Sequence, residues 1–214
     1  KAMWEEFSDV VGFWADMEHP YITYENNFIE SEWWALKEIW KKGLLYQGHK
    51  IVPYCPRCGT PLSSHEVAQG YKDVTERSAI VRFKAADEDA CFLAWTTTPW
   101  TLPSNLGLCV NPNVTYVKVR VYDKVYYLAE ALMDSVFADS WGDREVLETM
   151  KGKDLEYRKY EPLYPFADKD VQDKAFFVTC DDYVTTEDGT GIVHIAPAFG
   201  EDDNRVCRKY GMPF

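Results

Sequence analysis

The sequence predicts an α+β fold in which a β-barrel-like domain with peripheral helices follows an N-terminal appendage, helical at first and then zinc-ribbon-like. Three observations lead to this fold class. Aromatic side chains recur at helical spacing before residue 50, a Cys-x-x-Cys pair lies in the turn-rich stretch that follows, and β-branched residues alternate with polar ones from residue 78 onward. We therefore divide the 214 residues into a helical connecting segment (1–50), a ribbon-like linker (51–77) and a β-rich domain (78–214).

Two helices are expected in the connecting segment. The first has one apolar face, at positions i, i+3, i+7 and i+10, formed by Trp4, Phe7, Val11 and Trp14. The second runs over residues 28–42, where Asn26 or Asn27 can provide the N-cap and Gly43 can end the helix. Its apolar stripe consists of Trp33, Leu36, Ile39 and Trp40. We interpret both stripes as core or docking surface rather than as ligand-binding boxes.

Cys55 and Cys58 have the spacing of a zinc knuckle, in which a turn directs two thiolates at one Zn²⁺. A structural zinc site normally has four ligands, and no second Cys-x-x-Cys occurs in this chain, although His65 is a candidate third ligand. Two interpretations stay open: a pair of free thiols in a turn, or a half-site whose remaining ligands lie beyond residue 214. A redox role is disfavoured because no thioredoxin-like βαβ pattern surrounds the pair.

Seven strands and two helices are expected in the β-rich domain. Many strands with few helices between them favour a closed or strongly curved sheet, and Asp123-Lys124 can turn a hairpin within it. The expected helices cover residues 130–138 and 202–210. The expected strands cover residues 78–84, 91–95, 106–110, 115–122, 125–129, 175–180 and 192–195.

Composition argues against several classes of protein. The 23 basic and 35 acidic residues leave a net charge of −12, which disfavours a free-standing nucleic-acid binder because phosphate contacts need clustered Lys and Arg. No apolar run approaches the roughly 18 residues of a membrane span, and we expect no signal peptide and no membrane partner. The six cysteines are scattered apart from one pair, which is typical of a reduced, cytoplasmic protein.

The run from Trp95 to Asn105 combines four threonine hydroxyls, two indoles, two prolines and an amide. Pro99 and Pro103 fix φ and remove backbone donors, so we expect a rigid, mostly extended loop after Thr98. A rigid loop rich in hydroxyls can hold a polar ligand without using charge.

A second polar constellation occupies residues 188–203. Gly189 and Gly191 predict a tight turn into a strand that carries His194, and three carboxylates, the last of them Asp203, open the helix that follows. Each feature has an ordinary structural explanation, since acidic residues complement a helix dipole and a strand histidine is often a hydrogen-bonded core residue. Together, however, a carboxylate beside a hydroxyl-rich loop would bind an ammonium group and leave a neighbouring ester open to water.

The sequence shows no convincing nucleophile. It contains no Gly-x-Ser-x-Gly elbow, no cysteine paired in sequence with a histidine, and no Walker loop for ATP. If the protein is a hydrolase, water should attack directly, and the protein would act by positioning and by oxyanion stabilisation.

Eight segments of the chain carry a resemblance to a known family. They are Val11-Gly12-Phe13-Trp14, Tyr21-Ile22-Thr23-Tyr24, Glu32-Trp33-Trp34-Ala35-Leu36, Gly43-Leu44-Leu45-Tyr46 and residues 53–59, 62–71, 95–105 and 189–203. Together they resemble the editing insertion, or connective polypeptide 1, of class I isoleucyl-tRNA synthetases. The leucine and valine relatives typically have Thr-Thr-Arg-Pro, an acid and then Thr, whereas Thr98 stands here in place of Arg and Trp100 in place of the acid. This departure favours the isoleucine enzyme.

The resemblance implies a role for each polar group. Asp203 would bind the α-ammonium group of the substrate, and His194 would lie against its side chain and exclude isoleucine. The three consecutive threonines would hold the terminal adenosine or the reacting ester and its water, and Asn105 would support the loop or the water. The residues implied in catalysis are Thr96, Thr97, Thr98, Asn105 and Asp203. Those implied in substrate binding are Trp95, Trp100, Leu102, His194 and Phe199.

The implied reaction is hydrolysis of the ester in mischarged valyl-tRNA(Ile), with valyl-adenylate as a second substrate, and it needs no cofactor. The implied partners are the valine-carrying 3′ end of tRNA(Ile) and the remainder of a parent synthetase, in which Cys55 and Cys58 would contribute to a zinc site. We expect a monomeric, cytoplasmic fragment without aminoacylation activity, because the nucleotide-binding signatures of the family are absent. Two alternatives stay open: a module that docks tRNA without chemistry, and an editing domain of the valine or leucine relatives.

Overall fold

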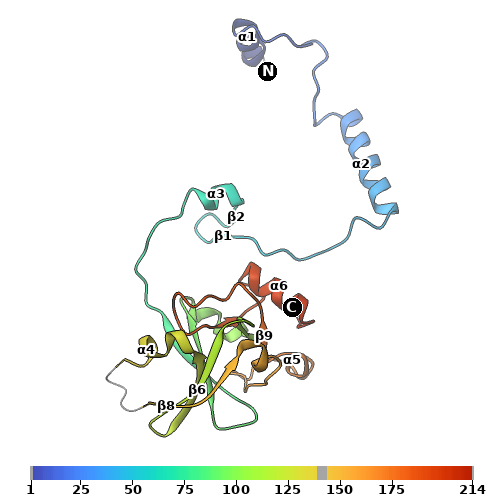
Figure 1. Ribbon diagram of the computed structural model, residues 1–214. Coiled ribbons are helices and arrows are strands. Elements are labelled where there is room, and N and C mark those ends of the chain that lie inside the picture. The colour runs from blue at the N-terminus through green and yellow to red at the C-terminus, as the bar shows by residue number, and fades with distance from the viewer. Residues whose placement is uncertain (1, 139–143, 214) are drawn as a thin grey trace. The chain divides into compact units, whose positions relative to one another are not determined.

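The computed structural model describes residues 2–138 and 144–213, and the chain divides into two compact units, residues 1–50 and 51–214 (Figure 1). The first unit contains the helices α1 (Ala2–Val10) and α2 (Asn26–Lys41). The second contains a two-stranded hairpin, an eight-stranded sheet and several short helices. The domain boundary expected near residue 77 stays a prediction.

The ends of α1 and α2 differ in part from the expected ones. The first helix stops at Val10, short of Trp14, because Gly12 adopts a left-handed φ of +71° and turns the chain. The N-cap of α2 is Glu25, without a side-chain cap, so the assignment to Asn26 or Asn27 is wrong. Gly43 does end α2, with a φ of +69° and an N–H that donates to the Trp40 carbonyl.

The aromatic stripes of these two helices are exposed. No residue of α1 or α2 is buried, and Trp14 is 96% exposed. The interpretation of the stripes as core is therefore wrong for this unit. The alternative that they form a docking surface stays a prediction.

The second unit begins with a small ribbon-like hairpin. Strands β1 (Tyr54–Cys55) and β2 (Thr60–Pro61) pair antiparallel, and helix α3 (Ser64–Ala68) follows them. A capping box fixes the start of α3, since the Ser63 hydroxyl accepts from the Glu66 N–H and the Glu66 carboxylate accepts from the Ser63 N–H.

The eight-stranded sheet contains every strand that the sequence predicts. Its order is β8-β6-β7-β4-β10-β5-β9, with β3 paired to β4. The strands are β3 (Ala79–Lys84), β4 (Cys91–Thr96), β5 (Gly107–Val110), β6 (Thr115–Val121), β7 (Lys124–Ala129), β8 (Arg144–Lys151), β9 (Phe177–Cys180) and β10 (Ile192–Ile195). Only β8 was not expected, because its side chains are mostly exposed and its sequence lacks an apolar alternation.

The sheet curls back on itself through a segment that is not part of a named strand. Lys159 bridges to Phe177 of β9, and Tyr160 bridges to Ala85, one residue beyond β3. The Tyr160 N–H donates to the Phe176 carbonyl at 3.0 Å. This segment therefore connects the edge of β9 to the end of β3, which confirms the barrel-like fold. The fully buried side chains inside include Phe83, Phe92, Leu108, Tyr127 and Ile192.

Short helices connect and flank the strands. They are η1 (Pro99–Ser104), η2 (Glu130–Leu132), α4 (Met133–Val136), η4 (Gly152–Leu155), α5 (Lys169–Lys174) and α6 (Glu201–Lys209). The helix expected over residues 130–138 is thus two single turns. The hairpin between β6 and β7 turns at Tyr122-Asp123, one residue earlier than expected, with a left-handed φ of +55° at Tyr122.

The segment after Thr98 is not the extended loop that its prolines suggested. It forms η1, a 3₁₀ helix with Pro99 at its first position and Pro103 inside it. A proline fixes φ near −65°, a value that both an extended polyproline segment and a 3₁₀ helix accept. The correction matters for the site, because a 3₁₀ turn places residues three apart on the same face.

Candidate functional site

A pocket of about 350 Å³ lies where the end of β4 and the start of η1 meet β10 and α6. Strands β4 and β10 pair in parallel with Val193 opposite Trp95, and this register brings the threonine-rich run beside the His194–Asp203 segment. The pocket is lined by Trp95, Thr96, Thr97, Thr98, Trp100, Thr101, Val193, His194, Phe199 and Asp203.

Eight of the ten residues expected in the site line this pocket. The two that do not are Leu102 and Asn105, which line a separate, mostly apolar pocket of about 300 Å³ with Pro103 and Ser104. Two lining residues, Thr101 and Val193, were not expected. The 3₁₀ geometry of η1 is the signal that would have found Thr101, since it puts Thr101 on the same face as Thr98.

The hydroxyls of Thr96 and Thr101 are held by bonds within their own turn. Thr96 is buried, and its Oγ1 accepts from the Thr98 N–H at 3.1 Å. The Thr101 hydroxyl donates to the Thr98 carbonyl at 2.9 Å. These local bonds fix the direction of the side chains before any ligand arrives, which reduces the entropy cost of holding a polar group.

His194 lies on β10 and contacts Thr101 across the pocket floor, with 3.1 Å between Nε2 and the Thr101 Oγ1. Because the Thr101 hydrogen is donated to a carbonyl, its oxygen accepts from His194, and Nε2 carries the imidazole proton. The Nδ1 atom is buried and has no hydrogen-bond partner among the described residues. Burial lowers the pKa of His194 to about 4, so the ring is neutral at physiological pH.

The Thr101–His194 contact has the distance of a nucleophile–base pair but not its proton arrangement. A base would have to accept the threonine proton at Nε2, and that nitrogen is the donor here. A pKa near 4 also makes the ring a weak proton acceptor. The contact therefore fixes a neutral aromatic wall and does not activate Thr101.

Asp203 lies in the first turn of α6, and one carboxylate oxygen accepts from the Ala196 N–H at 2.9 Å. Burial is the main cause that raises its pKa above the ordinary aspartate value. Gly200 makes room for the carboxyl group, because a Cβ there would lie 2.9 Å from the Asp203 carboxyl carbon. Asp203 forms no ion pair within the described part of the chain. A half-buried anion without a cation partner is suited to an ammonium ligand.

Asn105 is used by the scaffold rather than by the pocket. Its Nδ2 donates to the Gly107 carbonyl at 2.8 Å, and its Oδ1 accepts from the Tyr160 hydroxyl at 2.6 Å. These bonds connect the end of η1 to the segment that bridges β9 and β3. Leu102 is buried in the main core cluster. Both side chains therefore attach the threonine-rich run to the rest of the domain and do not line the pocket.

Cys55 and Cys58 provide two thiols in one turn, as a zinc knuckle does, but the other ligands of a zinc site are missing from the described residues. The Cys58 N–H donates to the Cys55 Sγ at 3.4 Å, and this bond lowers the pKa of Cys55. Within residues 2–138 and 144–213, no group of three or more His, Cys, Asp or Glu side chains could hold a metal ion. The expectation of His65 as a third ligand is therefore wrong, and its Nε2 instead contacts the Gln69 amide at 2.8 Å.

Comparison with known proteins identifies the family. A family model described as tRNA synthetases class I (I, L, M and V) matches residues 1–188. The chain belongs to this family. Isoleucine–tRNA ligase of Clostridium tetani is 56% identical over 99% of this chain, and that of Thermus thermophilus is 49% identical over 98%. In both cases the match covers 20% of the relative, so this class I synthetase chain spans about a fifth of the length of the curated relatives it matches.

A solved structure supports the fold of this synthetase segment. The editing domain of the cytosolic leucyl-tRNA synthetase of P. knowlesi superposes with a TM-score of 0.50 and 15% identity, over 68% of this chain and 70% of that chain. At this identity the likeness shows the fold alone. Among the described helices, none has the length and apolar character needed to cross a membrane.

Proposed function

We propose that this segment of a class I synthetase hydrolyses the ester of mischarged valyl-tRNA(Ile), with valyl-adenylate as a second substrate, by direct attack of water. The observation that carries the proposal is Asp203, a half-buried carboxylate that has no cation partner among the described residues and shares one pocket with the threonines. The similarity to isoleucine–tRNA ligases supports tRNA(Ile) as the carrier, and we propose valine as the amino acid that is removed.

The roles of the pocket residues follow from their chemistry. Asp203 binds the α-ammonium group of valine in a charge-assisted pair. The hydroxyls of Thr96, Thr97 and Thr98 hold the ribose or the ester and orient the water, which places the reacting atoms without a covalent intermediate. None of the pocket residues is a cysteine or a serine, and the only hydroxyl beside a histidine is not activated by it.

The pocket also provides a size filter. One methylene group changes binding to a hydrophobic site by only a modest factor, so a second site that admits valine and rejects isoleucine improves accuracy. Such a site needs walls that do not move. His194 is held by Thr101, Trp100 lies in a proline-containing 3₁₀ turn, and Trp95 lies in a paired strand.

The proposal includes the partners of the segment. The net charge of −12 means that basic residues elsewhere in a longer synthetase supply most contacts to the tRNA phosphates. Hydrolysis needs no cofactor, and the segment works as a monomer in the cytoplasm. Cys55 and Cys58 fit one half of a structural zinc site, so we propose that two further ligands come from residues outside this chain.

The test is deacylation of valyl-tRNA(Ile) by this chain and by the longer synthetase that contains it, with Asp203→Ala as the variant. We expect release of valine by the longer enzyme and strong loss of this release in the variant. Absence of valine release by both proteins would refute the proposal, as would full activity of the variant. Tight tRNA binding without hydrolysis would favour a docking module, and rapid cleavage of an isoleucyl ester would refute the isoleucine assignment.

A further inference from the structure

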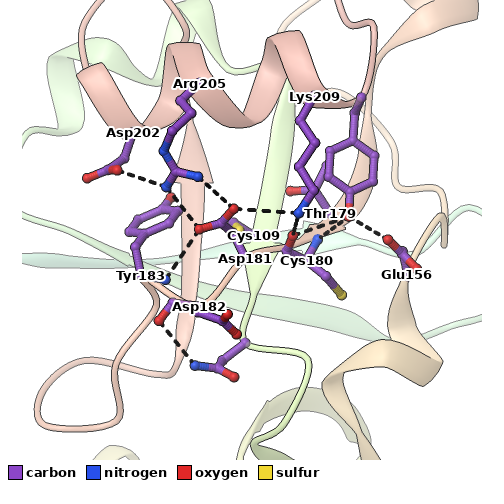
Figure 2. Close-up of polar contacts among 12 residues, drawn as sticks. Cys109, Glu156, Thr179, Cys180, Asp181, Asp182, Tyr183, Asp202, Arg205 and Lys209 are labelled. Carbon is purple, nitrogen blue, oxygen red and sulfur yellow. Dashed lines mark hydrogen bonds and ion pairs between the residues drawn. The ribbon is translucent and has the colours of Figure 1, made fainter.

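A cluster of charged residues outside the pocket joins α6 to the end of β9 (Figure 2). Asp181 directly follows β9, and its side chain is only 10% exposed. Arg205 of α6 binds it through both arms, with 2.9 Å between Nη1 and Oδ2 and 2.9 Å between Nη2 and Oδ1. Lys209, one turn further along α6, lies 3.6 Å from Asp181 Oδ2 and donates to the Cys180 carbonyl at 3.1 Å.

The two-armed bond fixes more than the distance between helix and strand. A guanidinium that meets a carboxylate through two parallel bonds has one orientation, so the bond also restricts rotation of the helix about its axis. Figure 2 shows Arg205 reaching from α6 toward Asp181, with the ring of Tyr183 beside it. The guanidinium lies 5.9 Å from the centre of that ring. The contact with Arg205 lowers the pKa of Asp181, which keeps the carboxylate ionised.

The first turn of helix α6 is held by two polar contacts besides this anchor, since the Asn204 amide donates to the Pro197 carbonyl at 3.2 Å and Asp203 accepts from the Ala196 N–H. Gly200 is the N-cap and provides no side-chain bond. The buried residues of the helix are Asn204, Val206 and Cys207, all of them after Asp203. Residues 203 and 205 are two apart, so their side chains leave the helix in roughly opposite directions. A rotation that released Arg205 from Asp181 would therefore move Asp203 within the pocket.

We propose that Asp181 is a positioning residue for Asp203 and acts through the two-armed bond to Arg205. The inference rests on the proposed role of Asp203 as the site of the α-ammonium group. Asp181 does not line the pocket, so its effect on hydrolysis comes only through the orientation of α6. The bond keeps the Asp203 carboxylate against the Ala196 N–H, in the pocket that the threonines also line.

The first experiment compares Asp181→Asn with Asp202→Asn in the longer synthetase, with valyl-tRNA(Ile) as substrate. Asp202 is the matched control, because its carboxylate also binds Arg205, at 2.9 Å. Both residues lie on α6, so this ion pair does not connect the helix to the sheet. We expect Asp181→Asn to lower kcat/KM for deacylation by roughly ten- to a hundredfold, mainly through KM. Asp202→Asn should change it by less than about threefold.

The second experiment separates positioning from general stability. Affinity for a hydrolysis-resistant amide analogue of valyl-adenosine is measured for Asp181→Asn, for Asp203→Asn and for the double variant. If Asp181 acts through Asp203, its substitution weakens binding in the parent protein and has no further effect once Asp203 is replaced. An equal weakening in both backgrounds would overturn the proposal.

Arg205→Lys provides a variant that keeps the charge and loses the two-armed geometry. We expect it to weaken binding of the same analogue, because a lysine contacts the carboxylate as a single point charge. If Asp181→Asn does not fold, an unchanged affinity in Arg205→Lys overturns the proposal by itself. A parent protein that does not release valine refutes the proposed function, whereas an active parent with unaffected variants refutes this inference alone.

Discussion

The hydroxyl of Thr101 lies 3.1 Å from Nε2 of His194, and this contact determines which nitrogen of the imidazole carries the proton. The same hydroxyl donates to the Thr98 carbonyl at 2.9 Å, so it can only accept from the ring. One side chain from the threonine-rich run thereby fixes the orientation of a side chain from β10. The two halves of the pocket are connected at this point, which the pairing of β4 with β10 brings together.

Replacing Thr101 by the isosteric valine tests this connection. Thr101→Val removes the acceptor and leaves the buried Nε2–H without a partner, which costs about 1–3 kcal/mol of stability. The free energy of unfolding in urea measures this loss. Thr101→Ser is the control that keeps the hydroxyl. Equal stability of the valine and serine variants would show that the hydrogen bond does not hold the ring.

Shrinking His194 tests the size filter. His194→Ala removes one lining side chain of the pocket, which the proposal places against the substrate side chain. We therefore expect isoleucyl-tRNA(Ile), which the proposed size filter excludes in the parent protein, to be hydrolysed at least about tenfold faster. Deacylation of isoleucyl- and valyl-tRNA(Ile) is measured in parallel, with His194→Gln as a control of similar length. A variant that still spares isoleucyl-tRNA(Ile) would contradict the steric role.

The lowered pKa of His194 makes stability depend on pH. Its pKa is about 4 in the folded protein against 6.5 ordinarily, so between these values the unfolded chain binds more protons at this position. The free energy of unfolding is therefore highest above pH 6.5, where the ring is neutral in both states. It decreases by about 3 kcal/mol as the pH falls from 6.5 toward 4. Unfolding free energies of the parent and of His194→Gln, measured from pH 7 to pH 4, should converge as the pH falls. Parallel curves would contradict the burial of the ring.

The periodicity of the sequence predicted the fold well where side chains alternate between core and solvent. The strands around Phe92, Leu108 and Ile192 have this alternation or a continuous apolar run, and all of them exist. Strand β8 has neither, since it pairs with β6 through its backbone while most of its side chains face solvent. The closure through Tyr160 was also not predictable, because isolated bridges leave no periodic pattern.

The site was predicted in its residues more than in its geometry. The compositions around Thr97 and Asp203 were unusual enough to mark both walls, and the register of β10 against β4 brings them together. Asn105, which the resemblance assigned to support of the loop or of the water, bonds to the scaffold at the end of the loop. The error concerned the extended conformation expected after Thr98. It arose because a fixed φ at Pro99 does not determine ψ, and ψ decides whether successive side chains alternate or share a face.

Gly189 is expected to set the position of the Trp95 wall. A Cβ at Gly189 would lie 2.9 Å from three carbon atoms of Trp95, and the backbone there has a φ of +79°. Gly189→Ala should displace the indole and lower kcat/KM for valyl-tRNA(Ile), because two of the three atoms, Cγ and Cδ2, belong to the ring. Gly211→Ala is the matched control, since Gly211 also has a positive φ, +64°, but no atom within 4 Å of the added Cβ. If both alanine variants reduce activity equally, backbone strain and not Trp95 is the cause.

Replacing Asp203 by asparagine should separate function from stability. The amide keeps the shape and can still accept from the Ala196 N–H, but it cannot pair with an ammonium group, so we expect deacylation to fall by roughly ten- to a hundredfold. Because burial raises the pKa of Asp203, its ionised form destabilises the folded state, and this penalty is present above the folded pKa and disappears as the pH falls through it. Asp203→Asn should therefore unfold at a higher urea concentration than the parent at pH 7, with the difference shrinking toward pH 4. A variant that loses both activity and stability at pH 7 would show that the carboxylate holds the fold together, and the pocket would then have no anion reserved for its ligand.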